Sequence, residues 1–195
     1  TEAKTGARSS AMRILIVRNA SASCEPDCAE WISAEGDITA ATPGLLRKVL
    51  KAAGGRKLPF VISSGGGDVT AGYVMGRLIR RAGLEVTVGR TRLLPCTANA
   101  RACSVAQAKG RYGWTDGASS YCYSACVFVL AGGIARHADP RSSIGVHQFT
   151  STQIVTRWLN TVQNGRLIRR QLLSVRRVAV DTSPQIYLRT ADYFG

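Results

Sequence analysis

The sequence predicts an α/β fold, because strand-like and helix-like segments alternate along its first half. Short apolar runs at 12–17, 58–63 and 84–88 are rich in Val, Ile and Leu, which is typical of buried strands. Helix-like segments at 42–50 and 70–82 separate these runs. Alternation of this kind favours parallel strands joined by helical crossovers.

The first helix-like segment has clear signals at both ends. Thr42-Pro43 begins it, because proline suits the first helical position, and Gly54-Gly55 ends it. The strand at 58–63 runs directly into Gly65-Gly66-Gly67 and then into the helix at 70–82. We therefore expect a strand, a flexible turn and a helix over 58–82.

Residues 90–120 interrupt this alternation and show no clear period. They contain Cys96 and Cys103, and we interpret them as a cysteine-containing insertion in loop conformation. A loop of this length is usually functional or mobile. Two readings stay open, a lid or wall of a substrate groove and a surface excursion held by its cysteines.

Length and composition indicate one domain. With 195 residues, of which 45% are hydrophobic, the chain can bury a substantial core. We assign residues 1–10 to a polar N-terminal tail and residues 11–195 to a single domain. No apolar run approaches the about 18 residues of a membrane-spanning helix. The polar start also suits a chain from which an upstream signal or anchor has been removed.

Three segments carry the residue types that acyl transfer needs. Ser124 precedes an apolar helix-like run, His147 ends the strand-like segment 142–147, and the glycine turn at 65–67 follows a strand. A serine hydroxyl becomes nucleophilic when a neutral imidazole accepts its proton, and backbone N–H groups stabilise the resulting oxyanion. Each feature alone has an ordinary explanation, namely a helix cap, a packed histidine and a turn. Their order and their placement at strand–helix junctions favour a site.

The same segments resemble the peptidase subunit of the Clp protease and its periplasmic relatives. The resemblance lies in Ser64–Gly72, in Ser124–Gly133, where a serine opens an apolar helix ending in Gly-Gly, and in Ser142–Gln148, a strand ending in His-Gln. It implies a ClpP/crotonase-type spiral of β-β-α units with helices packed outside.

The resemblance also implies roles for single residues. Ser124 would be the nucleophile, His147 the base, and the N–H groups of Gly67 and Ala125 the oxyanion hole. The family's third catalytic residue is an aspartate, but the matching position here holds Gln185. An amide can orient an imidazole without offsetting its charge.

Asp181, four residues before Gln185, is the candidate substitute for the missing aspartate. We therefore expect a Clp-like serine peptidase that forms an acyl-enzyme and needs neither cofactor nor metal, with a peptide or protein as substrate. Two alternatives stay open. One is a crotonase-type enzyme acting on acyl thioesters, and the other is an inactive Clp-like scaffold that binds peptides at the cell envelope.

Six cysteines bear on the compartment. The even number and the close pairs favour disulfides and a periplasmic or other extracytoplasmic location, with a membrane anchor upstream as an option. Zinc binding and free thiols are the competing readings. Only the pair Cys24–Cys28 is locally plausible from spacing, whereas Cys122 and Cys126 flank Ser124 and suggest either a crosslink at the nucleophile turn or simple core packing. The six candidates are Cys24, Cys28, Cys96, Cys103, Cys122 and Cys126.

The net charge of +14 arises from 26 basic and 12 acidic residues. Its densest part, 166–177, alternates arginines with apolar residues and predicts an amphipathic helix. That helix is either a solvated face or a contact with an anionic membrane surface or another copy of the chain in a homo-oligomer. A specific nucleic-acid partner is not expected, because no binding motif or interleaved aromatics accompany the charge.

Overall fold

The computed structural model describes residues 10–94, 111–147, 151–180 and 192–193. The chain divides into two compact units, residues 1–146 and residues 147–195, and each is described by itself. Membership of both units in one domain over 11–195, as the sequence predicts, stays a prediction. Ser10, the last residue of the predicted tail, accepts a hydrogen bond from the Asp37 N–H at 2.8 Å.

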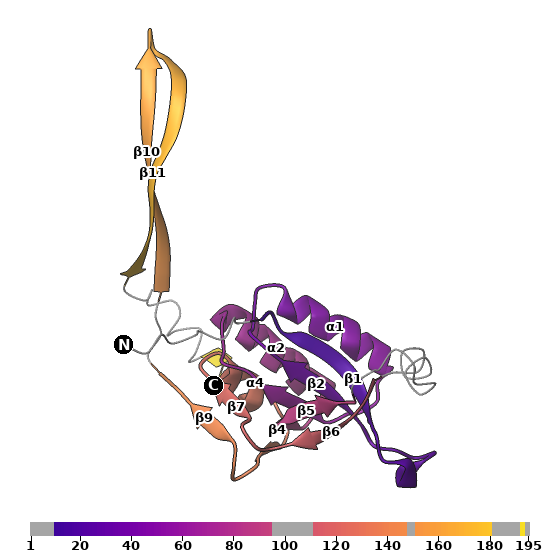
Figure 1. Cartoon of the computed structure of the whole chain (residues 1–195). Helices are drawn as coiled ribbons and strands as arrows, with labels where there is room; N and C mark the ends of the chain where they lie inside the picture. Colours follow the sequence, from indigo (N-terminus) through magenta and orange to yellow (C-terminus); the bar gives the residue numbers. More distant parts are fainter. Residues whose placement is uncertain (1–9, 95–110, 148–150, 181–191, 194–195) are drawn as a thin grey trace, which may run out of the picture. The chain divides into compact units, whose positions relative to one another are not determined.

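The first unit is built on a seven-stranded mixed sheet with the order β5-β6-β1-β2-β3-β4-β8 (Figure 1). Its strands are β1 (Arg13–Asn19), β2 (Glu30–Glu35), β3 (Phe60–Ser63), β4 (Val86–Val88), β5 (Arg90–Leu93), β6 (Arg111–Asp116) and β8 (Arg136–Ala138). The pairs β1–β2 and β5–β6 are antiparallel, and the other neighbours are parallel. The predicted α/β class is confirmed, and so are the predicted strands around 12–17, 58–63 and 84–88.

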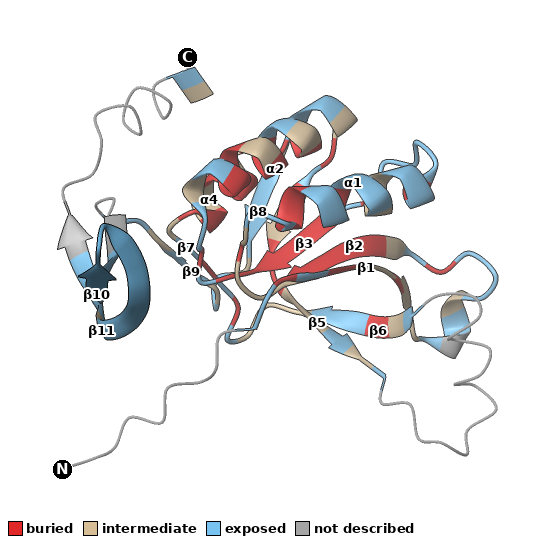
Figure 2. Cartoon of the chain, turned by 90° about the horizontal axis from the view of Figure 1, so that it is seen from above, coloured by how far each residue is buried: buried red, intermediate tan, exposed pale blue. Residues whose placement is uncertain are grey.

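Three helices, α1 (Thr42–Ala53), α2 (Val69–Ala82) and α4 (Cys126–Ala131), lie together on one side of β2 and β3 (Figure 2). The N-terminal signals of α1 and α2 agree with the sequence. Pro43 stands in the first turn of α1, and the Asp68 carboxylate caps α2 by accepting the Ala71 N–H at 2.8 Å. Both helices end at glycines with left-handed backbone, Gly54 and Gly83.

The main core lies between these helices and the central strands. The side chains of this core lie on the sheet face that α1 and α2 cover and on the helix faces that meet it. Its largest fully buried side chains include Phe60, Ile32, Ile38, Leu46, Ile62, Met75 and Ile79. A smaller cluster of Val17, Trp31 and Val61 belongs to a separate patch of the core. Two short strands, β7 (Tyr121–Tyr123) and β9 (Ser143–Gly145), form a separate parallel pair. An isolated bridge from Ser64 to Cys122 joins this pair to the end of β3.

The expectation of loop conformation across 90–120 is wrong at both ends of that segment. Residues 90–93 and 111–116 pair as β5 and β6 at the edge of the large sheet, with Arg92 opposite Trp114. Both strands mix polar and apolar residues, which hides the period that a buried strand would show, and only β5 is at the edge of the sheet. Residues 95–110, which contain Cys96 and Cys103, lie outside the described part.

The predicted helix over 166–177 is also wrong. In the second unit, β10 (Ser151–Gln163) and β11 (Arg166–Val180) form a long antiparallel hairpin that twists about its own axis (Figure 1). Asn164 and Gly165 both have positive φ, +48° and +74°, which is the geometry of a two-residue hairpin turn. The turn and the β-branched residues of β10 supply a partner strand, which overrides the helical spacing of leucine and arginine in β11.

A 3-10 turn, η1 (Ala22–Cys24), lies between β1 and β2. In the part of the chain that the structure describes, no helix is both long and apolar enough to span a membrane.

Candidate active site

Ser124 occupies a sharp turn between β7 and α4. Its φ is +55°, a left-handed conformation that a residue with a Cβ rarely adopts. Such strain costs about 1–3 kcal/mol and persists only where the surroundings impose it. The serine is half-buried, whereas its neighbours Ala125 and Cys126 are fully buried. The turn therefore holds one hydroxyl-bearing residue at the edge of the core in a strained position.

Backbone hydrogen bonds hold the turn on both sides. The Ser124 N–H donates to the Gly145 carbonyl of β9 at 2.9 Å, and the Ser124 carbonyl accepts the Val127 N–H at 3.0 Å. The disulfide between Cys122 and Cys126 spans the same turn, with Cα atoms 5.2 Å apart. Of the two open readings for these cysteines, the crosslink at the serine turn is therefore the one found.

The glycine loop packs directly against Ser124. Gly66 has φ of +101°, and a Cβ built on it would lie 2.7 Å from the Ser124 Cβ and 3.0 Å from the Ala125 nitrogen. No side chain larger than hydrogen fits between the loop and the turn at this point. The glycine is thus required by close approach as well as by its φ.

Residues of β3 and of the segment after β2 fix this loop. The Ile38 N–H donates to the Gly66 carbonyl at 2.8 Å, and the Ile38 carbonyl accepts the Asp68 N–H at 2.9 Å. The buried Ser64 hydroxyl accepts the Gly66 N–H at 3.1 Å. Gly67, with φ of +129°, lies so close to Ile38 that its Cβ would meet the Ile38 carbonyl oxygen at 2.1 Å. The loop is held by direct contacts on each side.

The two N–H groups predicted to form an oxyanion hole are available in this arrangement. Among the described residues, neither the Gly67 N–H nor the Ala125 N–H donates a hydrogen bond. They belong to segments that touch through Gly66 and Ser124. Free N–H groups beside a strained serine are what an acyl-transfer site needs for a developing oxyanion.

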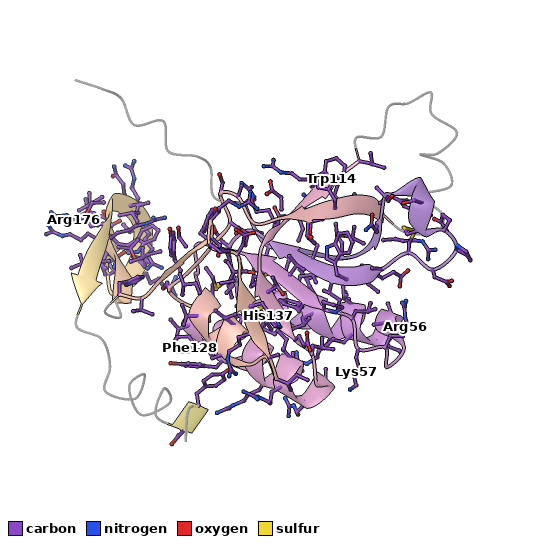
Figure 3. All side chains as sticks on the ribbon, turned by 90° about the horizontal axis from the view of Figure 1, so that it is seen from below. Arg56, Lys57, Trp114, Phe128, His137 and Arg176 are labelled. Atoms are coloured by element: carbon purple, nitrogen blue, oxygen red, sulfur yellow. A yellow bond between two sulfur atoms is a disulfide. The ribbon has the colours of Figure 1, made fainter. Side chains whose placement is uncertain are left out.

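Helix α2 approaches closely enough to fix the position of Ala125. A Cβ on Gly72 would lie 2.7 Å from the Ala125 carbonyl oxygen, and a Cβ on Gly132 would lie 2.3 Å from the Gly76 carbonyl oxygen. The small residues let α2 and α4 pack backbone to backbone. Phe128 of α4, labelled in Figure 3, also packs on Tyr73 of α2 with ring centroids 4.5 Å apart.

Two tyrosines flank the serine turn and were not singled out from the sequence. The rings of Tyr121 and Tyr123 stack with centroids 5.3 Å apart, and both side chains are exposed. Tyr123 lies against Gly145, where a Cβ would meet its ring at 2.7 Å, and Tyr121 lies 3.9 Å from the Cβ position of Gly65. Their alternation in a three-residue strand, beside the candidate nucleophile, was the available sequence signal.

The remaining predicted site residues, His147, Asp181 and Gln185, are not part of the first unit. His147 is exposed and begins the second unit, so its pairing with Ser124 stays a prediction. Asp181 and Gln185 lie outside the described residues. The chain's other histidine, His137 of β8, lies beside Glu85 with its Nε2 3.6 Å from the Glu85 carboxylate (Figure 3).

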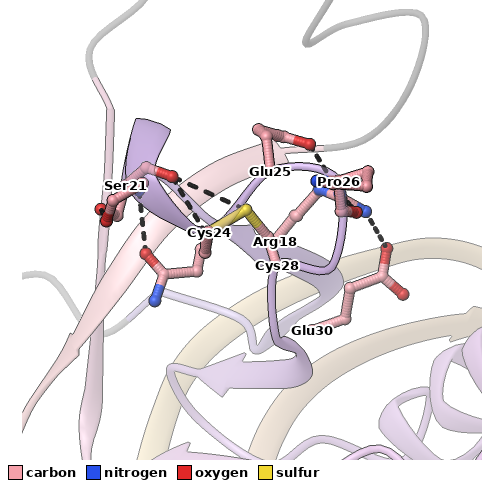
Figure 4. Close-up of a disulfide and its surroundings, with 9 residues drawn as sticks. Arg18, Ser21, Cys24, Glu25, Pro26, Cys28 and Glu30 are labelled. Atoms are coloured by element: carbon pink, nitrogen blue, oxygen red, sulfur yellow. Dashed lines mark hydrogen bonds and ion pairs between the residues drawn. A yellow bond between two sulfur atoms is a disulfide. The ribbon is translucent and has the colours of Figure 1, made fainter.

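The second disulfide, Cys24–Cys28, closes the loop between β1 and β2 (Figure 4). Arg18 reaches across this loop to the Glu25 carboxylate at 2.9 Å and to the Pro26 carbonyl. Two disulfides fit an oxidising, extracytoplasmic location. Within the described residues, no group of three or more His, Cys, Asp or Glu side chains is placed to hold a metal ion.

A hollow of about 610 Å³ lies elsewhere on the first unit, lined by Trp31, Val61 and Trp114 among others. Its carboxylates already have partners. A hydrogen bond from the Ala118 N–H lowers the pKa of Asp116, and a hydrogen bond from the Arg92 side chain lowers it further. Hydrogen bonds from Arg141 lower the pKa of Asp139. The hollow includes neither Ser124 nor the glycine loop, and its paired charges offer no poised acid or base.

No protein-family model, curated protein or solved structure matches the chain. The arrangement around Ser124 therefore stands on its own geometry.

Proposed function

We propose that the protein is a Clp-like serine hydrolase, acting on a peptide or protein outside the cytoplasm. The observation that carries the proposal is the strained Ser124, with φ of +55°, set against a glycine loop and beside the N–H groups of Gly67 and Ala125. A structural helix cap would not require a left-handed serine. Strain of this kind clusters at functional sites, where the surroundings over-determine it.

In the proposed mechanism His147 is the general base. A ring nitrogen accepts the Ser124 hydroxyl proton as the oxygen attacks the substrate carbonyl, and the oxyanion accepts the Gly67 and Ala125 N–H groups. The imidazolium then protonates the leaving amine, and water hydrolyses the acyl-enzyme by the reverse roles.

The fold is compatible with the proposed ClpP/crotonase-type spiral. Parallel strands β2, β3 and β4 carry helices α1 and α2 between them, and the short β7–β9 pair joins the end of β3 through Ser64. The glycine loop follows β3 and the serine follows β7, so two strand ends converge on one point. The disulfides support the extracytoplasmic part of the proposal, and a periplasmic location is its specific form.

Labelling with a fluorophosphonate probe tests the proposal. The wild-type protein should form one adduct on the peptide that contains Ser124, and Ser124→Ala should form none. Ser143→Ala is the matched control, because Ser143 is an exposed serine on the adjacent strand β9 and its variant should label like the wild type.

Other outcomes would replace the proposal. An unlabelled wild-type protein that retains coenzyme A would indicate the crotonase-type acyl-thioester enzyme, which uses the oxyanion hole without a serine nucleophile. An unlabelled protein that binds peptides without cleaving them would indicate the inactive scaffold at the envelope. Equal labelling of wild type and Ser124→Ala would remove Ser124 from the nucleophile role.

A further inference from the structure

The β10–β11 hairpin has two chemically different faces. Residues directly opposite each other in an antiparallel pair have their side chains on the same face. Because Trp158 is opposite Leu172, these two side chains define one face of the hairpin. One face carries Ile154, Trp158, Val162, Leu167, Leu172 and Val175, together with Arg170 and Arg177. The other carries the remaining four of the six arginines of the hairpin, Arg157, Arg166, Arg169 and Arg176, together with Val155 and Leu159.

Both faces are open. All of the apolar side chains named above are exposed, including 42% of Trp158 and 57% of Leu167. A two-stranded hairpin without a covering layer is marginally stable in water, and apolar surface of this extent marks an interaction site.

The charge of the hairpin selects the kind of partner. Residues 151–180 contain six arginines and no acidic residue. The rest of the chain keeps 20 basic residues against 12 acidic ones, so it is itself net positive. A second copy and the remainder of this chain both carry a net positive charge, so the overall charge favours an anionic partner over either of them.

The mixture of arginine and apolar side chains favours a lipid surface over a nucleic acid. A bilayer interface takes up tryptophan and aliphatic side chains while its phosphates pair with arginine. The Arg170 guanidinium lies over the Trp158 ring at 4.3 Å, so a charge and an aromatic ring are presented together. A nucleic acid would pair with the arginines but leave the apolar face uncovered, with one tryptophan as the only aromatic residue for stacking.

We propose that the β10–β11 hairpin docks the protein on an anionic lipid bilayer, with the Trp158 face in the interface and the arginines at the headgroups. This surface function is independent of hydrolysis at Ser124. The docking element is this hairpin and not the amphipathic helix that the sequence predicts for 166–177.

Vesicle co-sedimentation with the full chain tests the docking. The protein should bind vesicles of phosphatidylcholine mixed with phosphatidylglycerol, ignore vesicles of phosphatidylcholine alone, and release as salt is raised. Brominated lipid should quench part of the tryptophan fluorescence in the wild type, and that part should be missing in Trp158→Phe, because Trp31 and Trp114 remain in both proteins.

Charge variants locate the binding surface. Replacing Arg157, Arg166, Arg169 and Arg176 by Gln should weaken binding by about fivefold for each arginine lost. The matched control removes the same charge from exposed residues of the first unit by replacing Arg47, Lys48, Lys51 and Arg81 with Gln. The control should bind within a few-fold of the wild type. If the arginine-to-glutamine set does not fold, the corresponding lysine set keeps the charge and should bind.

Four results would overturn the proposal. Equal loss in the hairpin and control sets would mean that binding follows the total charge of +14 alone. Hairpin-dependent binding to duplex DNA without binding to vesicles would assign the surface to nucleic acid. A hairpin-dependent dimer in sedimentation equilibrium without vesicle binding would assign it to a second copy. Vesicle binding that survives in the lysine set but leaves Trp158 unquenched would exclude the apolar face from the interface.

Discussion

Replacing Gly66 by alanine should destabilise the protein and disrupt the contact between the glycine loop and Ser124. Gly66 has φ of +101°, so alanine there pays a left-handed backbone cost of about 1–2 kcal/mol. The new Cβ would also lie 2.7 Å from both the Ser124 Cβ and the Tyr123 carbonyl oxygen. Overpacking in a close-packed region adds about 1–3 kcal/mol, so the total loss of unfolding free energy is about 2–5 kcal/mol.

Gly55→Ala is the matched control. Gly55 has φ of +83°, and a Cβ built on it has open space for 4 Å around it. It therefore pays the backbone cost without the clash. The difference in unfolding free energy between the two variants isolates the contact between the glycine loop and the serine turn.

Urea unfolding measures both variants, and fluorophosphonate labelling measures the site. Gly66→Ala should be less stable than Gly55→Ala by about 1–3 kcal/mol and should label far more slowly. If the two variants are equally stable and label equally fast, the loop does not pack on Ser124 and the reasoning about the site is wrong.

Three further predictions concern redox state, pH and the third catalytic position. Under mild reductant without denaturant, the Cys24–Cys28 bridge, whose Cys24 is partly exposed, should be alkylated before the fully buried Cys122–Cys126 bridge. Loss of the Cys122–Cys126 bridge should cost about 2 kcal/mol from its short loop. Peptide mapping that shows the reverse order would contradict the burial. The pKa of Asp116 is lowered in the folded protein, so the Asp116 carboxylate stabilises the fold above the ordinary carboxyl pKa of about 4. This stabilisation is lost as the pH falls through the pKa of Asp116 in the folded protein. An NMR titration that gives Asp116 a pKa at or above the ordinary value would contradict the prediction. Gln185→Asp should raise the peptidase rate, because loss of the carboxylate partner of the imidazolium lowers the rate by about four orders of magnitude. Asp181→Asn should leave the peptidase rate nearly unchanged. Inactivity of Asp181→Asn would show instead that Asp181 completes the triad.

Local signals predicted the first half of the fold. Pro43 begins α1 as expected, because a first-turn proline acts within a few residues and needs no tertiary information. The apolar runs before Gly65 and Gly89 became central strands because burial on both faces leaves a continuous hydrophobic signature.

The hairpin was missed because its deciding signal lies outside the periodic segment. Residues 166–177 have helical spacing, yet the Asn164-Gly165 turn and the preceding strand pair this segment as a strand along most of its length. The strands β5 and β6 were missed for a related reason, since strands of mixed polarity show no clear period.

At the candidate site, residue type and order singled out Ser124 and the glycine turn, and the family resemblance added Gly67 and Ala125. It did not predict the positive φ of Ser124, the stacked tyrosines or the support from Ile38. These features depend on which segments meet in space. Ile38 is an ordinary apolar residue, and only its backbone N–H and carbonyl bond to the glycine loop.

A crystal structure of the protein after reaction with a phosphonate tests the central claim most directly. We expect a covalent bond from phosphorus to the Ser124 Oγ, with the phosphoryl oxygen about 2.7–3.1 Å from the nitrogens of both Gly67 and Ala125. An adduct on another residue, or a phosphoryl oxygen turned away from these two N–H groups, would contradict the account.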